Sequence, residues 1–173
     1  MRCRITLLLV SSCIIDSTKA QFVPPDLYDE DYNKAIGFWE DKDQIVDANG
    51  NPTDVEFYSE GGFPRAYLRD KSLVSFTVAR VDTNIATTDT IYRLDMWPHG
   101  SGALDVLPFG VEQKDWHQNF YMAHCGSSGV TDVMGYSRVI YESIYDSIDW
   151  HFYSGSKGQK MAFVMRPGCD SAN

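Results

Sequence analysis

The chain has 173 residues, enough for one domain with a hydrophobic core and not comfortably for two. Its 15 Lys and Arg against 24 Asp and Glu give a formal net charge of −9. A surface with this charge repels nucleic-acid phosphates and anionic lipid headgroups, which argues against both as partners. After residue 20, no segment has the roughly 20 uninterrupted apolar residues that a membrane-spanning helix needs.

Residues 1–20 have the pattern of a secretory signal peptide. Arg2 and Arg4 form a positive head, the apolar run ITLLLVSSCII follows, and TKA precedes Gln21. We therefore expect an exported protein whose mature chain begins at Gln21 and carries 12 basic and 23 acidic residues, a net charge of −11. The segment VSSC also resembles a bacterial lipobox, so a lipoprotein anchored at Cys13 is the alternative.

Residues 21–37 are acidic, contain a Pro-Pro pair and show no sustained apolar period, so they are expected to be a leader segment. A single domain is expected over 38–173, where the apolar period is two. In DVEFYSE (54–60), SLVSFTVARV (72–81) and TIYRLDMW (90–97), large apolar side chains alternate with smaller or polar ones. This alternation predicts β-strands with one face toward a core.

Short Gly-, Asn-, Pro- and Ser-rich stretches separate these segments, as in NGNP, EGG, PHGSG, GSSG and GSKG. No window of twelve or more residues sustains a helical stripe. About 8–9 short strands at this spacing predict an all-β fold. We expect an antiparallel β-sandwich, with a partly open barrel as the alternative.

The segment 148–166 is predicted to be a β-hairpin, with IDWHFY and QKMAFVMR as its strands and SGSKG as its turn. Trp150 and Phe152 point to one face, which is apolar. Asp149 and His151 share the other face, which is expected to be solvated.

Two cysteines remain after removal of the signal peptide, Cys125 and Cys169. In an oxidising compartment an isolated pair usually forms a disulfide, which would stabilise the fold by roughly 3–4 kcal/mol. Two free buried thiols are the alternative.

Motifs for catalysis are incomplete throughout the chain. The segment HCGSSG lacks the second cysteine and the tryptophan of a thiol-protease motif, and GYSRV has one of the two glycines of a nucleophile elbow. Asp149 and His151 lie about 7 Å apart on a strand, and a second DWH occurs at 115–117, but H-x-H and H-E-x-x-H spacings are absent. We therefore expect no enzyme and assign neither catalytic residues nor metal ligands.

The segment DANGNP resembles the start of an EF-hand calcium loop but fails its later positions, where Pro52 replaces glycine and Tyr58 replaces glutamate. No cofactor is therefore expected. A looser calcium site, in which loop carboxylates share the ion, is the alternative. Its ligands would be Asp41, Asp43, Asp47 and Asp54.

Four segments, read in order, resemble a domain of unknown function found at the N-terminus of large secreted bacterial proteins. Those proteins carry SBBP β-propeller repeats, Ig-like modules and gliding-motility-associated or sorting C-termini. The segments are FWEDKDQIVDANGNPTDVEFY, TDTIYRLDM, QNFYMAH and YSRVIYESIYDSIDWHFYSGSKGQKMAFVMRPG. The resemblance covers about 38–172. It departs from the family pattern at Asp43, where the pattern has glycine, and at Asp146–Ser147, where it has Pro-Gly.

This resemblance implies export and a place in a surface or adhesion protein, and it carries over no catalytic residue. We expect a non-enzymatic extracellular module that docks against other extracellular modules or binds a surface partner. A carbohydrate-binding or carbohydrate-active domain and a calcium-stabilised adhesin module are the alternatives, and the oligomeric state is left open. An exposed aromatic patch is the expected contact surface, and its candidate residues are Trp97, Trp116, Tyr121 and Tyr136.

Overall fold

The computed structural model of the chain describes residues 8–14, 37–61, 64–80, 90–100, 106–155 and 158–169. Apart from Gly37, the expected leader segment lies outside these residues. The described residues form strands, joined by turns and one short 3₁₀ turn, η1 (Ala123–Cys125). The strands are β1 (Leu8–Ile14), β2 (Gly37–Glu40), β3 (Val55–Glu60), β4 (Arg65–Arg69), β5 (Val74–Arg80), β6 (Thr90–Met96), β7 (Phe109–Phe120), β8 (Val130–Tyr145), β9 (Ile148–Gly155) and β10 (Gly158–Met165).

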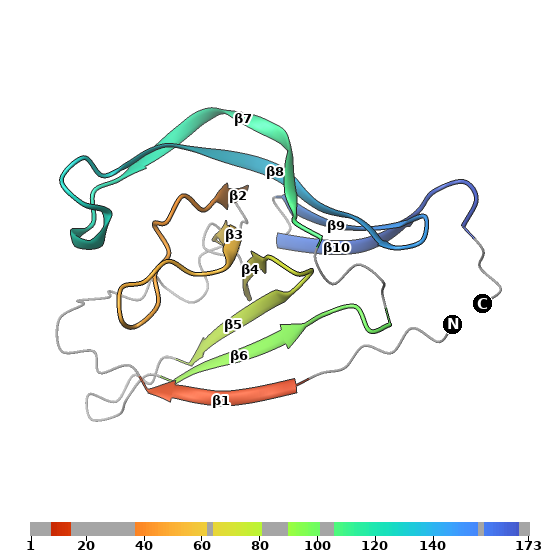
Figure 1. Cartoon of the computed structure of the whole chain (residues 1–173), viewed down its shortest axis with the longest axis horizontal. Coiled ribbons are helices and arrows are strands. Elements are labelled where there is room, and N and C mark those ends of the chain that lie inside the picture. Colours follow the sequence, from red (N-terminus) through yellow and green to blue (C-terminus); the bar gives the residue numbers. More distant parts are fainter. Residues whose placement is uncertain are drawn as a thin grey trace.

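All the described strand pairs are antiparallel and belong to one sheet, in the order β1-β6-β5-β4-β3-β2-β8-β9-β10. The long strand β8 pairs with β7 along one edge and with both β2 and β9 along the other. The sheet curls into a half-barrel, so that β7 to β10 lie across from β4, β5, β6 and β1 (Figure 1). This confirms the predicted antiparallel all-β class, in the form of the partly open barrel.

Strand β1 lies within the segment expected to be a signal peptide, and it pairs with the outer edge of β6. In the part of the chain that the structure describes, no helix is long and apolar enough to cross a membrane.

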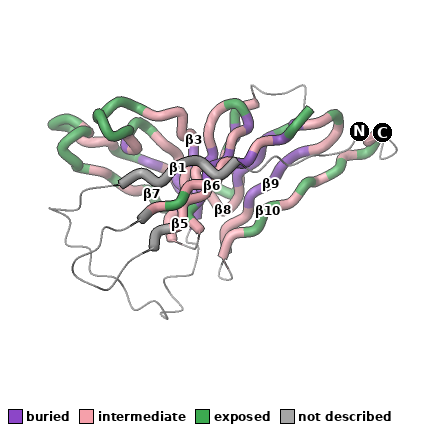
Figure 2. Tube along the Cα trace, turned by 90° about the horizontal axis from the view of Figure 1, so that it is seen from below, coloured by how far each residue is buried: buried purple, intermediate pink, exposed green. Residues whose placement is uncertain are grey.

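The core lies inside the curl, where buried residues of β8 and β9 gather with those of the strands opposite (Figure 2). Trp150 and Phe152 are both almost fully buried, and their burial contributes roughly 3 kcal/mol each. The predicted hairpin of 148–166 is confirmed, since β9 pairs with β10 along its whole length. On the core-side face of β10, at the end of the sheet, Phe163 stacks on Trp150 at 5.6 Å between ring centroids yet stays 44% exposed.

The hydroxyl group of Tyr141 ties the two sides of the curl together. Its side chain on β8 is fully buried, and its hydroxyl lies 2.7 Å from the carbonyl oxygen of Arg69 and 3.2 Å from that of Leu73. These two residues flank the turn between β4 and β5. Burial raises the pKa of Tyr141 well above its ordinary value, so the hydroxyl keeps its proton.

Two departures from the family pattern fall at left-handed backbone positions. Asp43 has φ of 70° and Ser147 has φ of 58°, and the pattern places glycine at both. Glycine adopts this conformation without the steric cost that a Cβ atom adds. The backbone therefore gives a reason for glycine at both positions, where this chain has larger residues.

The expectation that Asp149 and His151 face solvent is wrong, because each is only 8% exposed. Strand β9 is flanked by β8 and β10, and long arginine side chains shield its polar face. Arg166 lies 3.3 Å from Asp149, which also accepts a 2.7 Å hydrogen bond from the backbone N–H of Ser143. Burial lowers the pKa of His151, and the charge of the neighbouring Arg138 lowers it further.

Candidate functional site

A pocket lies on the outer face of β3 to β6, on the side of these strands opposite the core. It has a volume of about 190 Å³ and opens to solvent. Seven of its eight lining residues carry a hydroxyl or a charged group, although most of the surface that they expose to the pocket is apolar. The lining residues are Thr53, Asp54, Val55, Tyr67, Arg69, Ser75, Thr77 and Arg93.

Strand periodicity explains why these residues share one face. In β4, Ala66 and Leu68 are buried in the core, so the alternate residues Tyr67 and Arg69 point the other way. The same alternation in β5 and β6 sends their polar residues to the pocket side. The register then aligns Tyr67, Ser75 and Asp95 in one row across β4, β5 and β6.

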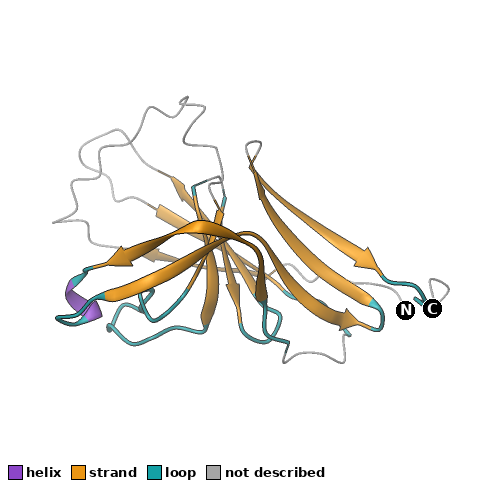
Figure 3. Cartoon of the chain, turned by 90° about the horizontal axis from the view of Figure 1, so that it is seen from above, coloured by secondary structure: helices purple, strands orange, loops and turns teal. Residues whose placement is uncertain are grey.

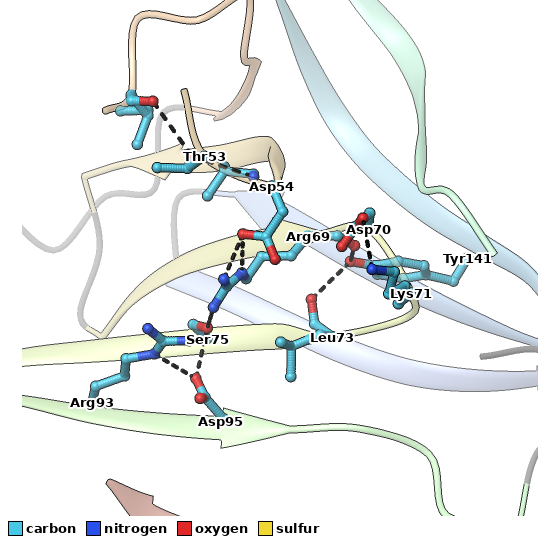
Figure 4. A network of polar contacts seen from close by, with 12 residues as sticks. Thr53, Asp54, Arg69, Asp70, Lys71, Leu73, Ser75, Arg93, Asp95 and Tyr141 are labelled. Carbon is cyan, nitrogen blue, oxygen red and sulfur yellow. Dashed lines mark hydrogen bonds and ion pairs between the residues drawn. The ribbon is translucent and has the colours of Figure 1, made fainter. Parts of the chain in front are cut away.

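Arg69 is held on both sides by hydrogen bonds (Figure 4). Its Nε and Nη2 atoms lie 2.6 Å and 2.5 Å from Oδ1 of Asp54, and its Nη1 atom donates to Oγ of Ser75 at 3.3 Å. The backbone on either side is also fixed, since the N–H of Arg69 donates to the carbonyl of Leu73 and Tyr141 holds the carbonyl of Arg69. The guanidinium is therefore a rigid part of the pocket wall.

Ser75 extends this hydrogen-bond network from Arg69 to the next strand, β6. Its hydroxyl donates to Oδ1 of Asp95 at 2.7 Å, and the same oxygen accepts a 2.7 Å bond from Nε of Arg93. Burial of Asp95 opposes its ionisation, but the hydrogen bonds from Arg93 and Ser75 and the charges of Arg93 and Arg69 hold its pKa below the ordinary value. Asp95 is thus an anion that positions Arg93.

The arrangement is suited to recognising a polar ligand. It offers guanidinium donors, a carboxylate acceptor on Asp54, and hydroxyl groups that can both donate and accept. Tyr67 adds an aromatic side chain to the wall. Because the residues come from adjacent paired strands, the groups are held in place before a ligand arrives, which reduces the entropy cost of binding.

Of the four aromatic residues expected to form a contact patch, three lie on the β7–β8 hairpin, and the fourth, Trp97, follows β6. Trp116 on β7 is 44% exposed and packs edge-on against Trp39 at 4.8 Å between ring centroids. Tyr121, just after β7, is 72% exposed. Tyr136 is half-buried against Phe57. Trp97 is half-buried after the end of β6, and no ring contact within the described residues joins any two of the four candidates.

The structure gives no support to the predicted bridge between Cys125 and Cys169, which are both free and half-buried. Cys125 lies in η1 at the tip of the β7–β8 hairpin, whereas Cys169 follows β10 at the opposite end of the molecule (Figure 3). A disulfide requires Cα atoms less than about 7 Å apart. Sequence spacing alone could not reveal this separation.

Three of the four aspartates considered for a loose calcium site are engaged in local structure. Oδ1 of Asp41 accepts from the backbone N–H groups of Gln44 and Ile45, Oδ1 of Asp47 accepts from the turn that follows it, and Asp54 pairs with Arg69. Within the described ranges, no three His, Cys, Asp or Glu side chains are grouped so that they could hold a metal ion.

The predicted alternation in TIYRLDMW separates Arg93 and Asp95 from Leu94 and Met96, but it did not identify the pocket. The signal was present as the polar alternates of three consecutive strands, in RAYLR, VSFTV and IYRLD. What was missing was the register that brings those alternates side by side.

Residues 38–173 match a family model described as a domain of unknown function (DUF7948). No curated protein and no solved structure gives a significant match to the chain.

Proposed function

The chain belongs to the DUF7948 family, and from the pocket on β3 to β6 we propose that it is a non-enzymatic extracellular module that binds carbohydrate. The observation that carries this proposal is the lining of the pocket: hydroxyls, a carboxylate and two guanidinium groups around one tyrosine. Sugars are recognised by such groups because each sugar hydroxyl both donates and accepts hydrogen bonds.

Binding is favoured over hydrolysis by the hydrogen-bond partners of the two aspartates, Asp54 and Asp95. Glycoside hydrolysis usually needs one carboxyl group that carries a proton and a second that is ionised. Asp54 and Asp95 each accept a hydrogen bond from the Nε atom of an arginine. The pair therefore serves to hold Arg69 and Arg93 in place.

The wider setting of the proposal is a secreted or cell-surface bacterial protein with SBBP repeats or a gliding-motility sorting signal. It rests on the family resemblance and on the signal-like residues 1–20. In that setting the pocket would serve adhesion to a glycan surface. A surface on Trp116 and its neighbours that docks other extracellular modules is the second candidate, favoured by the exposure of that tryptophan beside Trp39.

A glycan array probed with the purified full-length protein tests the proposal. We expect binding that is lost in Thr77→Trp, which fills the pocket without removing a charge. Thr131→Trp, at an exposed position of β8, is the matched control and should bind normally. Thermal unfolding of both variants checks that they are folded.

Four results would overturn the proposal. The wild-type protein could bind no glycan on the array, or Thr77→Trp could bind as well as the control. Loss of binding in Trp116→Ala but not in Thr77→Trp would move the site to β7. Release of reducing sugar from a bound glycan would refute the non-enzymatic assignment.

A further inference from the structure

The two arginines of the pocket differ in how much of their hydrogen-bonding capacity is used. Arg69 has Nε, Nη1 and Nη2 all engaged, by Asp54 and Ser75. Arg93 donates from Nε to Asp95, and no residue in the described part of the chain accepts a hydrogen bond from its Nη1 or Nη2. Its side chain is 41% exposed, so these two donors are open to a ligand.

Arg93 and its counter-ion Asp95 differ in their position relative to the pocket. Arg93 belongs to the lining, and Asp95, which holds its Nε edge, does not. A ligand in the pocket therefore meets the guanidinium before it meets that carboxylate. The two terminal amino groups of a guanidinium match the two oxygens of a carboxylate in spacing and in plane.

The rest of the pocket has no second free charge and is suited to hydroxyl groups. Arg69 and Asp54 neutralise each other, and Thr53, Thr77 and Tyr67 contribute hydroxyl groups. The volume of about 190 Å³ corresponds to roughly six water molecules at about 30 Å³ each, which is room for one sugar ring.

We infer that the pocket binds an acidic sugar, a hexuronate unit whose carboxylate pairs with Nη1 and Nη2 of Arg93 while its ring hydroxyls meet the threonines and Asp54. This inference rests on the proposed carbohydrate-binding function and names its ligand. The net charge of −9 repels a polyanion from the surface as a whole. Recognition is then local, by one charged contact inside the pocket, and differs from attraction to a broad basic patch.

Calorimetric titration of the full-length protein tests the inference with three probes: trigalacturonate, the same trisaccharide as its methyl ester, and sodium acetate. The ester keeps the sugar ring and its hydroxyls and masks the carboxylate. We expect trigalacturonate to bind at least tenfold more tightly than the ester and far more tightly than acetate. Because the attraction depends on a single charged contact, we also expect the affinity for trigalacturonate to change little between 0.05 and 0.3 M salt.

Arg93→Gln should reduce the affinity for trigalacturonate to that of the ester, because it removes the charged contact. Arg65→Ala is the matched control: Arg65 lies on the same strand face as Tyr67 and opposite Thr77, is exposed, and does not line the pocket. It should change the affinity less than twofold. If Arg93→Gln is poorly folded, Thr77→Val keeps every charge and should weaken both saccharides equally.

The outcomes separate this inference from the proposed function. Equal affinity for trigalacturonate and its ester overturns the inference and leaves carbohydrate binding standing. If acetate binds as tightly as trigalacturonate, the sugar ring is not recognised, and the pocket is only a carboxylate site. Equal losses in Arg93→Gln and Arg65→Ala overturn the assignment to the pocket, and no binding of either saccharide overturns this inference.

Discussion

Replacement of Tyr141 by phenylalanine isolates the hydroxyl that links β8 to the β4–β5 turn. The ring is fully buried and the substitution keeps its shape, so the change is confined to hydrogen bonds with the carbonyls of Arg69 and Leu73. The carbonyl of Leu73 keeps its bond from the N–H of Arg69. The loss is therefore about one buried hydrogen bond, and we expect the free energy of unfolding to fall by about 1–2 kcal/mol.

Urea unfolding followed by far-ultraviolet circular dichroism measures this loss as a lower midpoint at unchanged slope. Tyr121→Phe is the control, because Tyr121 is 72% exposed and its replacement should change stability by less than about 0.5 kcal/mol. A fall in Tyr141→Phe no larger than in the control would refute the role of the hydroxyl as a link.

The pH dependence supplies a second readout. The folded protein keeps the proton on Tyr141, because burial raises its pKa well above the ordinary value, whereas the unfolded chain releases that proton near pH 10. Alkaline pH therefore favours the unfolded state of the wild-type protein, and stability is lost as pH rises above about 10. The variant lacks this contribution, so the difference in stability between the two proteins should narrow from pH 9 to pH 11. A constant difference would contradict the reasoning.

Three further predictions follow from the turns, the loop after β2 and the N-terminus. Asp43→Gly and Ser147→Gly should each raise the free energy of unfolding by about 0.5–1 kcal/mol in urea, because both positions have positive φ; a decrease in either would show that the side chain contributes more than the strain costs. Burial raises the pKa of Asp41 to about 6, so its contribution to stability is full below about pH 4 and is lost as pH rises through 6. The Asp41→Asn variant lacks this pH dependence. At pH 7 its free energy of unfolding should exceed that of the wild type by about 1 kcal/mol, after a discount for the partial exposure of Asp41, and at pH 4 the two should be equal. A higher stability of the variant at both pH values would point to another cause. Intact mass of the exported protein should correspond to a chain that begins at Gln21; a lipid on Cys13 would establish the lipoprotein alternative, and an uncleaved Met1 would refute both. Cleavage before Gln21 removes β1, which leaves β6 at the edge of the sheet.

The alternation of side chains predicted the fold class and the two faces of the strands. Val74 and Phe76 belong to the core cluster or pack against it, and Ser75 and Thr77 line the pocket, as the period of two in SLVSFTVARV requires. The hairpin around Trp150 was also readable from the sequence, because its strands and its turn are neighbours along the chain. Local alternation carries this information, since each residue's face depends only on its position within its own strand.

The burial of Asp149 and His151 could not be read in this way. Alternation assigns them to the face opposite Trp150, and it does not say whether that face meets water. Arg166, 17 positions beyond Asp149, forms an ion pair with it, and the charge of Arg138, on another strand, acts on His151. The separation of Cys125 from Cys169 could not be read from the sequence either, because it depends on where two different hairpins end.

The sequence by itself determined that the chain forms antiparallel strands with one apolar face, and it identified the family through motifs spread along residues 38–168. Only the tertiary structure decided that Asp54, Arg69, Ser75 and Arg93 meet in one pocket and that Tyr141 holds the turn beneath it. The physical reason is that alternation is a property of neighbours in the chain, whereas register and curl arise from pairing between segments. Asp54 and Arg69 are 15 positions apart, and Tyr141 is 72 positions from the carbonyl it holds.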